Sequence, residues 1–289
     1  MVQLISQYAA QLKRLRFWKQ FARSFFAAVG LMSFTIGLFG LLYPEFFKAR
    51  WWIVIAVAAV ALLWAAWVER PQTPAQRYSF NGSIRLVIGD LFEQDEANVL
   101  IGMSSTFDTD VTGGIISRNS IQGQFLERVY GGSVQNLDRE LGAALSASGG
   151  PVGTILKPGK QDIYPLGTVA TLSTTNGKKY FCVAYTNMDS HNVAHGSIQG
   201  VLDSLNAVWD ECDRRGNGAP ICTPMIGQGL ARIPELTPEI SIRLIAFSFL
   251  LRSRRRRFSR ELRIVLTKEG ASQINMQEFQ AFLASVAQL

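Results

Sequence analysis

The sequence has few residues of the kinds that build disulfide frameworks or metal centres. Its 289 residues include three cysteines, Cys182, Cys212 and Cys222, and two histidines, His191 and His195. Three widely spaced cysteines form neither a disulfide framework nor a zinc-binding pattern, so we expect a reducing compartment for the globular part. The histidines are four residues apart without a convincing third or fourth ligand, so we predict no metal site.

Charge is absent from two segments near the N-terminus. Residues 24–43 read SFFAAVGLMSFTIGLFGLLY and residues 51–68 read WWIVIAVAAVALLWAAWV. A helix needs about 20 apolar residues to cross the hydrocarbon core of a bilayer, so both segments qualify, the second only just. Tyr and Trp lie near their ends, as interfacial aromatic residues do. Two such segments so close together exclude a single cleaved signal peptide and disfavour a buried soluble hairpin. We predict a transmembrane α-hairpin.

The basic residues around these segments predict an orientation. Lys and Arg are enriched on the cytoplasmic side of membrane proteins. More of them precede the first segment than lie in the connection, so we expect a multi-pass protein with both termini in the cytoplasm. The residues are Lys13, Arg14, Arg16, Lys19 and Arg23 before the first segment, and Lys48 and Arg50, beside Glu45, in the connection.

The rest of the chain alternates between strand and helix patterns. We predict a basic segment at 1–23, the hairpin at 24–68, a polar Pro-containing linker at 69–78, and a globular domain at 79–289. Strands are predicted at 84–88, 98–103, 167–172, 180–185, 219–225 and 261–266. Helices are predicted at 121–130, 134–145, 198–212, from 237 to the arginines that begin at 252, and at 277–286. Interleaved strands and helices indicate an α/β sandwich with a largely parallel or mixed sheet.

Three of the predicted strands end in loops suited to a ligand. These loops contain Gly89 and Asp90, residues 102–114, and residues 227–232. Ligands bind at the carboxyl ends of strands in such sheets. Taken alone, the Gly227-Gln228-Gly229 motif is compatible with a turn or with a phosphate cradle, and Asp90 is compatible with a turn or helix-cap role.

Together the motifs resemble those of the macro domain, an ADP-ribose-binding α/β fold. The resemblance rests on VIGDLF at 87–92, NVLIGM at 98–103, a Gly-Gly-containing loop, and PMIGQGLARIP at 224–234. It covers about 79–289 and implies a three-layer α/β/α sandwich with a mixed sheet. With the N-terminal hairpin, the chain resembles the membrane-anchored macro-domain effector of type II Thoeris anti-phage systems.

The resemblance implies a binding site for an ADP-ribose derivative, with no other cofactor. Asp90, next to Leu91, would accept a hydrogen bond from the exocyclic amine of adenine, since a carboxylate offers only acceptors. The phosphate loop would be formed by Gly227, Gln228, Gly229, Leu230 and Ala231. Phosphate and ribose would be bound by Ser104, Ser105, Thr106, Gly113 and Gly114, with Phe107 as an apolar wall, and Asn187 would line the pocket.

One departure from the family bears on chemistry. Macro-domain hydrolases carry an Asn-rich segment after the second strand, whereas this chain has GMSSTFDTD at 102–110. We therefore expect ligand sensing rather than catalysis. A membrane-anchored ADP-ribosyl hydrolase and an ADP-ribose reader remain the alternatives. Asp108 and Asp110 are compatible with binding a ribose hydroxyl or an amine, or with being solvated loop acids.

The resemblance also implies partners and a location. A TIR-domain enzyme would consume NAD and supply the ligand, a histidine conjugate of ADP-ribose in that family, as a diffusible product. The effector would lie in the bacterial inner membrane, form ligand-induced homo-oligomers and disrupt the lipid bilayer, causing cell death or growth arrest. Gly30, Gly37 and Gly40 would allow close helix contact. The arginine run at 254–257 lacks interleaved aromatic residues, so we expect no nucleic-acid partner.

Overall fold

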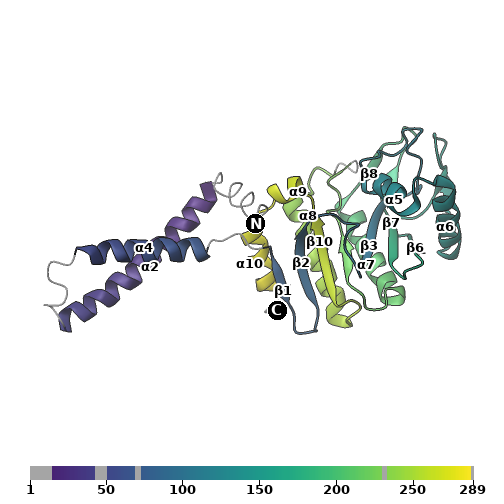
Figure 1. Cartoon of the computed structure of the whole chain (residues 1–289). Helices are drawn as coiled ribbons and strands as arrows, with labels where there is room; N and C mark the ends of the chain where they lie inside the picture. Colours follow the sequence, from purple (N-terminus) through teal and green to yellow (C-terminus); the bar gives the residue numbers. More distant parts are fainter. Residues whose placement is uncertain (1–14, 43–50, 69–72, 230–232, 288–289) are drawn as a thin grey trace. The chain divides into compact units, whose positions relative to one another are not determined.

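The computed structural model describes residues 15–42, 51–68, 73–229 and 233–287 (Figure 1). The chain divides into two compact units, residues 1–72 and residues 73–289. The predicted linker at 69–78 therefore runs into the second unit, where residues 75–77 form a strand.

The first unit contains two apolar helices that pack against each other, α2 (Leu15–Leu42) and α4 (Trp52–Val68). Ala61 and Ala65 of α4 are fully buried, so the helices approach closely through small side chains. Most large apolar side chains of both helices are exposed, including Phe34 and Leu63. Residues Phe21–Leu42 are long and apolar enough to cross a membrane, while the 17-residue α4 is shorter.

The second unit is built on one mixed sheet with strand order β1-β2-β10-β9-β3-β7-β6. Neighbouring strands from β2 to β7 in this order are parallel, whereas β1, β6 and the short β8 are antiparallel additions. The strands are β1 (Ala75–Arg77), β2 (Ser83–Ile88), β3 (Asn98–Ser104), β6 (Val169–Ser173), β7 (Lys179–Met188), β8 (Ala194–Gly196), β9 (Ile221–Thr223) and β10 (Glu261–Leu266). A separate two-stranded sheet pairs β4 (Gly153–Thr154) with β5 (Asp162–Ile163).

Helices cover both faces of the sheet and give three layers. The helices are α5 (Ile121–Tyr130), α6 (Val134–Ala147), α7 (Ile198–Arg215), α8 (Pro238–Arg255), α9 (Lys268–Ser272) and α10 (Met276–Ala287). One core contains side chains of α7, α8 and α10, and the other contains side chains of α5 and α6. Successive residues of β3 point to opposite faces of the sheet, as in any strand. Leu100 lies in the core with α7, α8 and α10, and Ile101 lies in the core with α5 and α6. The predicted α/β/α sandwich is confirmed.

Most predicted elements are present, with differences that have local causes. The hairpin of β6 and β7 turns through Gly177, whose φ of 80° suits glycine. The strand predicted at 219–225 is shorter because Pro220 and Pro224 flank β9, and proline cannot donate to a sheet. Strands β1, β4, β5 and β8 and helix α9 are additional, each of five residues or fewer.

Candidate functional site

The three predicted ligand loops lie at the same edge of the sheet. Asp90 follows β2, Gly227 follows β9, and Ser105 follows β3, and these three strands run parallel. In the strand order, β9 lies between β10 and β3, so the Gly227 loop lies between the other two loops. The sheet therefore brings together loops that are far apart in the sequence.

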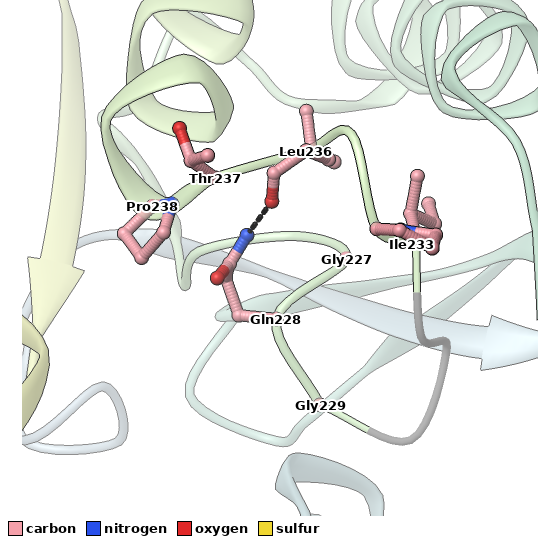
Figure 2. Close-up of a pocket in the computed structure, with 8 residues that line it drawn as sticks. Gly227, Gln228, Gly229, Ile233, Leu236, Thr237 and Pro238 are labelled. Atoms are coloured by element: carbon pink, nitrogen blue, oxygen red, sulfur yellow. Dashed lines mark hydrogen bonds between the residues drawn. The ribbon is translucent and has the colours of Figure 1, made fainter.

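A pocket of about 370 Å³ opens between the Gly227 loop and the beginning of α8 (Figure 2). The side-chain amide of Gln228 donates a hydrogen bond to the backbone oxygen of Leu236, which ties the loop to the residues before the helix. The pocket is lined by Gly227, Gln228, Gly229, Ile233, Pro234, Leu236, Thr237 and Pro238. Leu230 and Ala231, also predicted for this loop, lie outside the described residues.

The two glycines of the loop have different structural roles. Gly227 has a φ of 78°, which favours glycine, and a Cβ there would lie 2.5 Å from Leu236 Cδ2, so the leucine side chain would have to move. Gly229 is exposed and is not among the positive-φ residues, and no described atom lies within 4 Å of the position that a Cβ would take there. Of these two glycines, Gly227 is therefore the one with a left-handed backbone.

Helix α8 begins at the pocket wall with a regular cap. Thr237 Oγ1 accepts a hydrogen bond from the Ile240 N–H at 3.3 Å, and Pro238 occupies the first turn. The first N–H groups of a helix have no intrahelical acceptor, so the N-terminus carries a partial positive charge. A helix start beside a glycine loop is suited to binding an anion.

Tyr185 of β7 forms a hydrogen bond with the backbone of this loop. A Cβ at Gly102 would lie 2.6 Å from Tyr185 Cε1, so the absence of a side chain at Gly102 makes room for the ring. Burial raises the pKa of Tyr185 to about 12, although a hydrogen bond with the backbone of Gly227 acts in the opposite direction. Gly102, predicted to begin a ligand loop, thus lies within β3 and accommodates the tyrosine.

Asp90 is already bonded on both carboxylate oxygens. Its Oδ1 accepts the Phe92 N–H at 2.8 Å, and its Oδ2 forms an ion pair with Arg128 of α5. The Arg128 guanidinium also lies 5.3 Å from the centre of the Phe92 ring. Burial alone raises the pKa of Asp90, but hydrogen bonds from Arg128 and the Phe92 backbone lower it below its ordinary value. Asp90 is therefore a carboxylate at neutral pH; the neighbouring Leu91 is buried.

The loop after β3 is buried more deeply than a ligand-lining loop was expected to be. Ser104, Ser105 and Thr106 are 6%, 1% and 1% exposed. Ser105 is held by the end of β7, since its N–H donates to Thr186 O at 2.7 Å and its Oγ accepts the Met188 N–H at 3.1 Å. Phe107, predicted as an apolar wall, lies in the core beneath the loop with its ring edge-on to Tyr164.

The two acids of this loop differ. Asp108 is not a solvated acid, because it is 1% exposed and forms an ion pair with Lys157 at 2.8 Å. Asp110 forms a turn in which its Oδ1 accepts hydrogen bonds from Thr112 and from the Gly113 N–H. The hydrogen bond from the Thr112 side chain lowers the pKa of Asp110.

The remaining predicted residues are not among the described residues that line the pocket. Gly113 and Gly114 are exposed, and Gly114 has a φ of 70°. Asn187 is exposed near the end of β7, where it is paired in register with His195 of β8. His195 Nε2 lies 2.9 Å from Asp189 Oδ2.

Comparison with known proteins assigns the family. The family model "Thoeris protein ThsA, Macro domain" matches residues 84–267, which is more than half of the 289-residue chain. The chain belongs to the Thoeris ThsA macro-domain family. The match runs from β2 to the residue after β10 and so includes every parallel strand of the described sheet and the three loops.

The individual known proteins that this chain resembles are distant from it in sequence. The Thoeris protein ThsA of Bacillus amyloliquefaciens (strain Y2) is 24% identical over 211 residues, which cover 71% of this chain and 69% of that protein. A variant of the Oceanobacillus iheyensis macrodomain with ADPR has a TM-score of 0.44 at 10% identity and covers 74% of this chain and 100% of its own. The Trypanosoma brucei macrodomain in complex with ADP-ribose has a TM-score of 0.43 at 9% identity. The match covers 70% of this chain and 68% of that one.

Three residues around the site were not found from the sequence of this ThsA-family chain. Arg128 pairs with Asp90 from 38 residues away, and Lys157 pairs with Asp108 from 49 residues away. Tyr185 was assigned only to a strand. The glycine at 102 inside an otherwise bulky strand was the one signal of a close approach, which Tyr185 makes.

Proposed function

We propose that this chain is a membrane-bound sensor in anti-phage defence whose macro domain binds an ADP-ribose derivative. The observation that carries the proposal is the pocket between the Gly227 loop and the N-terminus of α8, in a chain of the Thoeris ThsA macro-domain family. Its volume falls within the range of ligand pockets, roughly 300–1,000 Å³. A diphosphate suits this position because backbone N–H groups and the helix dipole both favour an anion.

The order of the loops supports an extended ligand. Asp90 lies two strands from β9 in the sheet, which is about 10 Å at ordinary strand spacing. Adenine at Asp90, with the diphosphate at Gly227–Gly229, directs the second ribose toward the loop after β3. Asp90 must then share its carboxylate between Arg128 and the adenine amine, which is compatible with the several acceptor positions of a carboxylate.

Sensing is favoured over hydrolysis by the loop after β3. In place of an Asn-rich segment, this loop contains hydroxyl side chains and an aspartate that is paired with Lys157. A membrane-anchored hydrolase or a reader of ADP-ribosylated proteins is the alternative. Release of ADP-ribose from a modified protein by the purified chain would establish the hydrolase.

The helical hairpin is proposed to lie in the bacterial inner membrane, with both termini in the cytoplasm. The outward faces of α2 and α4 expose large apolar side chains such as Phe26, Leu41 and Trp64, which lipid would cover. The ligand is proposed to be the diffusible product of an NAD-consuming TIR-domain enzyme. No nucleic acid is required.

Ligand binding is proposed to bring several hairpins together and so disrupt the bilayer. One apolar hairpin cannot line an aqueous pore, because its backbone bonds are internal and its side chains are almost wholly apolar. No described atom lies within 4 Å of the position that a Cβ would take at Gly30 or Gly37, so both positions have room for a close contact with another copy. A ligand promotes this assembly only if it binds the assembled state more tightly.

The test uses the full-length chain in detergent. Calorimetry with ADP-ribose should show saturable binding, and size measurements should show larger particles when the ligand is present. Absence of binding refutes the sensor. Binding without growth in particle size, in cells that still lose membrane integrity, refutes the clustering mechanism alone.

A further inference from the structure

The outward face of α8 carries four apolar side chains in a line, which we call the α8 stripe. Ile240, Phe247 and Leu251 are 42%, 42% and 49% exposed, and Leu244 is partly buried. Spacings of four, three and four residues place them on one side of a helix with 3.6 residues per turn. The opposite side of α8 lies in the core. The helix is therefore apolar on both sides, which is the pattern of a helix that is covered all round.

The helices on either side of α8 lack such a stripe. In α10 the exposed side chains are the small residues Ala281 and Ser285. In α7 the exposed side chains after the first residue are all polar: Gln199, Asp203, Asn206, Asp210, Arg214 and Arg215. An apolar patch on an otherwise polar surface marks a contact surface.

Charged side chains border the α8 stripe and are paired with acids of the flanking helices. Toward α10, Arg243 lies 3.5 Å from Glu278. Toward α7, Arg252 lies 2.8 Å from Asp210. The negative surface of a membrane would attract the arginines but repel the acids on both sides. An apolar centre with a polar border of both charges is instead the composition of a protein–protein interface.

We propose that the α8 stripe is the surface through which two copies of this chain meet about a two-fold axis. In an antiparallel pair of α8 helices centred on Phe247, each phenylalanine ring meets its counterpart. Glu239 lies eight residues before Phe247 and Arg255 eight residues after it, so the acidic first turn of each helix is level with the basic last turn of the other. The opposite partial charges of the helix ends favour the same arrangement.

The area of the α8 stripe makes this contact weak on its own. A helix of 18 residues is about 27 Å long and about 10 Å wide, which gives an outward face of about 270 Å². A stable interface buries about 800 Å² on each partner. Assembly therefore needs a further contribution, and the stripe begins two residues after Pro238 of the pocket wall, beside the proposed ligand. The inference rests on the proposed ligand-driven clustering and names its surface.

Opposite charges at position 247 test this contact in the full-length chain in detergent. Phe247→Glu and Phe247→Lys each place like charges opposite one another at the two-fold axis. Each variant alone should therefore lose the increase in particle size that ADP-ribose causes, and an equimolar mixture of the two should regain it. Phe247 is exposed enough for both variants to fold, which thermal unfolding checks. Ser146→Glu and Ser146→Lys, at an exposed position of α6, are the matched controls and should behave like the wild type.

Cysteine cross-linking measures the same contact independently. The natural cysteines Cys182, Cys212 and Cys222 are buried, so a short bis-maleimide should react with an introduced surface cysteine. With ADP-ribose present, Phe247→Cys should form covalent dimers, and Ser146→Cys should remain monomeric on a denaturing gel.

The outcomes separate the surface from the function. Larger particles from both charged variants alone, or equal cross-linking at positions 247 and 146, would overturn the α8 contact and leave clustering to the hairpins. Assembly by Phe247→Lys alone, with no effect of mixing, would indicate a negatively charged occupant such as lipid and would also overturn it. A wild-type chain that does not bind ADP-ribose, or binds it without growing in size, refutes the proposed function itself.

Discussion

Replacing Gly229 with valine should abolish ligand binding and leave the fold intact. Gly229 lies at the pocket wall, it is not among the positive-φ residues, and no described atom lies within 4 Å of a Cβ there. A substitution at such an exposed position changes the free energy of unfolding by about 0.5 kcal/mol or less. The branched side chain would occupy the space that the diphosphate needs to reach the backbone N–H groups.

The expected loss of affinity follows from the hydrogen bonds that are blocked. Bonds from backbone N–H groups to a charged phosphate contribute about 1.5–3 kcal/mol each. Losing two of them costs about 3–6 kcal/mol, which is at least about a hundredfold in the dissociation constant.

Gly227→Ala is the matched comparison. Its Cβ would lie 2.5 Å from Leu236 Cδ2, at a φ of 78°. The left-handed backbone costs about 1–2 kcal/mol, and displacing Leu236 adds about 1 kcal/mol. Calorimetric binding and thermal unfolding should therefore separate the two glycines: Gly229→Val loses binding alone, and Gly227→Ala also loses stability. Normal binding by a folded Gly229→Val chain would refute a phosphate role for this loop.

Asp90→Ala should weaken ADP-ribose binding by about 1–3 kcal/mol, because it removes the acceptor for the adenine amine, and unchanged affinity in calorimetry would show that Asp90 serves only its ion pair with Arg128. The folded chain should lose stability in acid, as followed by unfolding at pH values between neutral and about 3. The reason is that hydrogen bonds from Arg256 and Arg252 lower the pKa of Asp213 in the folded chain. The stability contributed by the ionised Asp213 is therefore present above the unfolded pKa of 3.8 and is lost as the pH falls through the folded pKa. A free energy of unfolding that does not change with pH in this range would contradict this. A maleimide should leave Cys222 unmodified until the chain unfolds, since the thiol is buried and burial raises its pKa to about 12, and rapid labelling of the native protein would show that β9 opens.

Local signals in the sequence were sufficient for the elements that carry them. Helix α5 was predicted with its observed bounds. Ser120 caps its start, where the serine Oγ accepts the Gly123 N–H, and Gly131, which has a left-handed backbone conformation, caps its end. Helix α8 was predicted to begin at residue 237, and Thr237 caps it by accepting the Ile240 N–H. The short strands β1 and β8 have no such signal, because they exist only by pairing with β2 and β7.

The location of the site could be predicted from the sequence, but the ion pairs and hydrogen bonds of its side chains could not. Three glycine- or acid-bearing loops after parallel strands must lie at one edge, and they do. Which partner each side chain finds depends on tertiary packing: Asp90 meets Arg128 of α5, and Asp108 meets Lys157. Neither pair has a sequence spacing that indicates contact. Similarly, the sequence does not indicate that Leu236 and Ile233 lie beside Gly227.

Equilibrium binding of ADP-ribose to the detergent-solubilised full-length chain tests the central claim most directly. AMP, which has no diphosphate, serves as the control ligand. The account predicts saturable binding of one ADP-ribose per chain, with AMP much weaker, because the diphosphate meets the Gly227 loop and the start of α8. No saturable binding of ADP-ribose to the folded chain, or equal affinity for AMP, would contradict it.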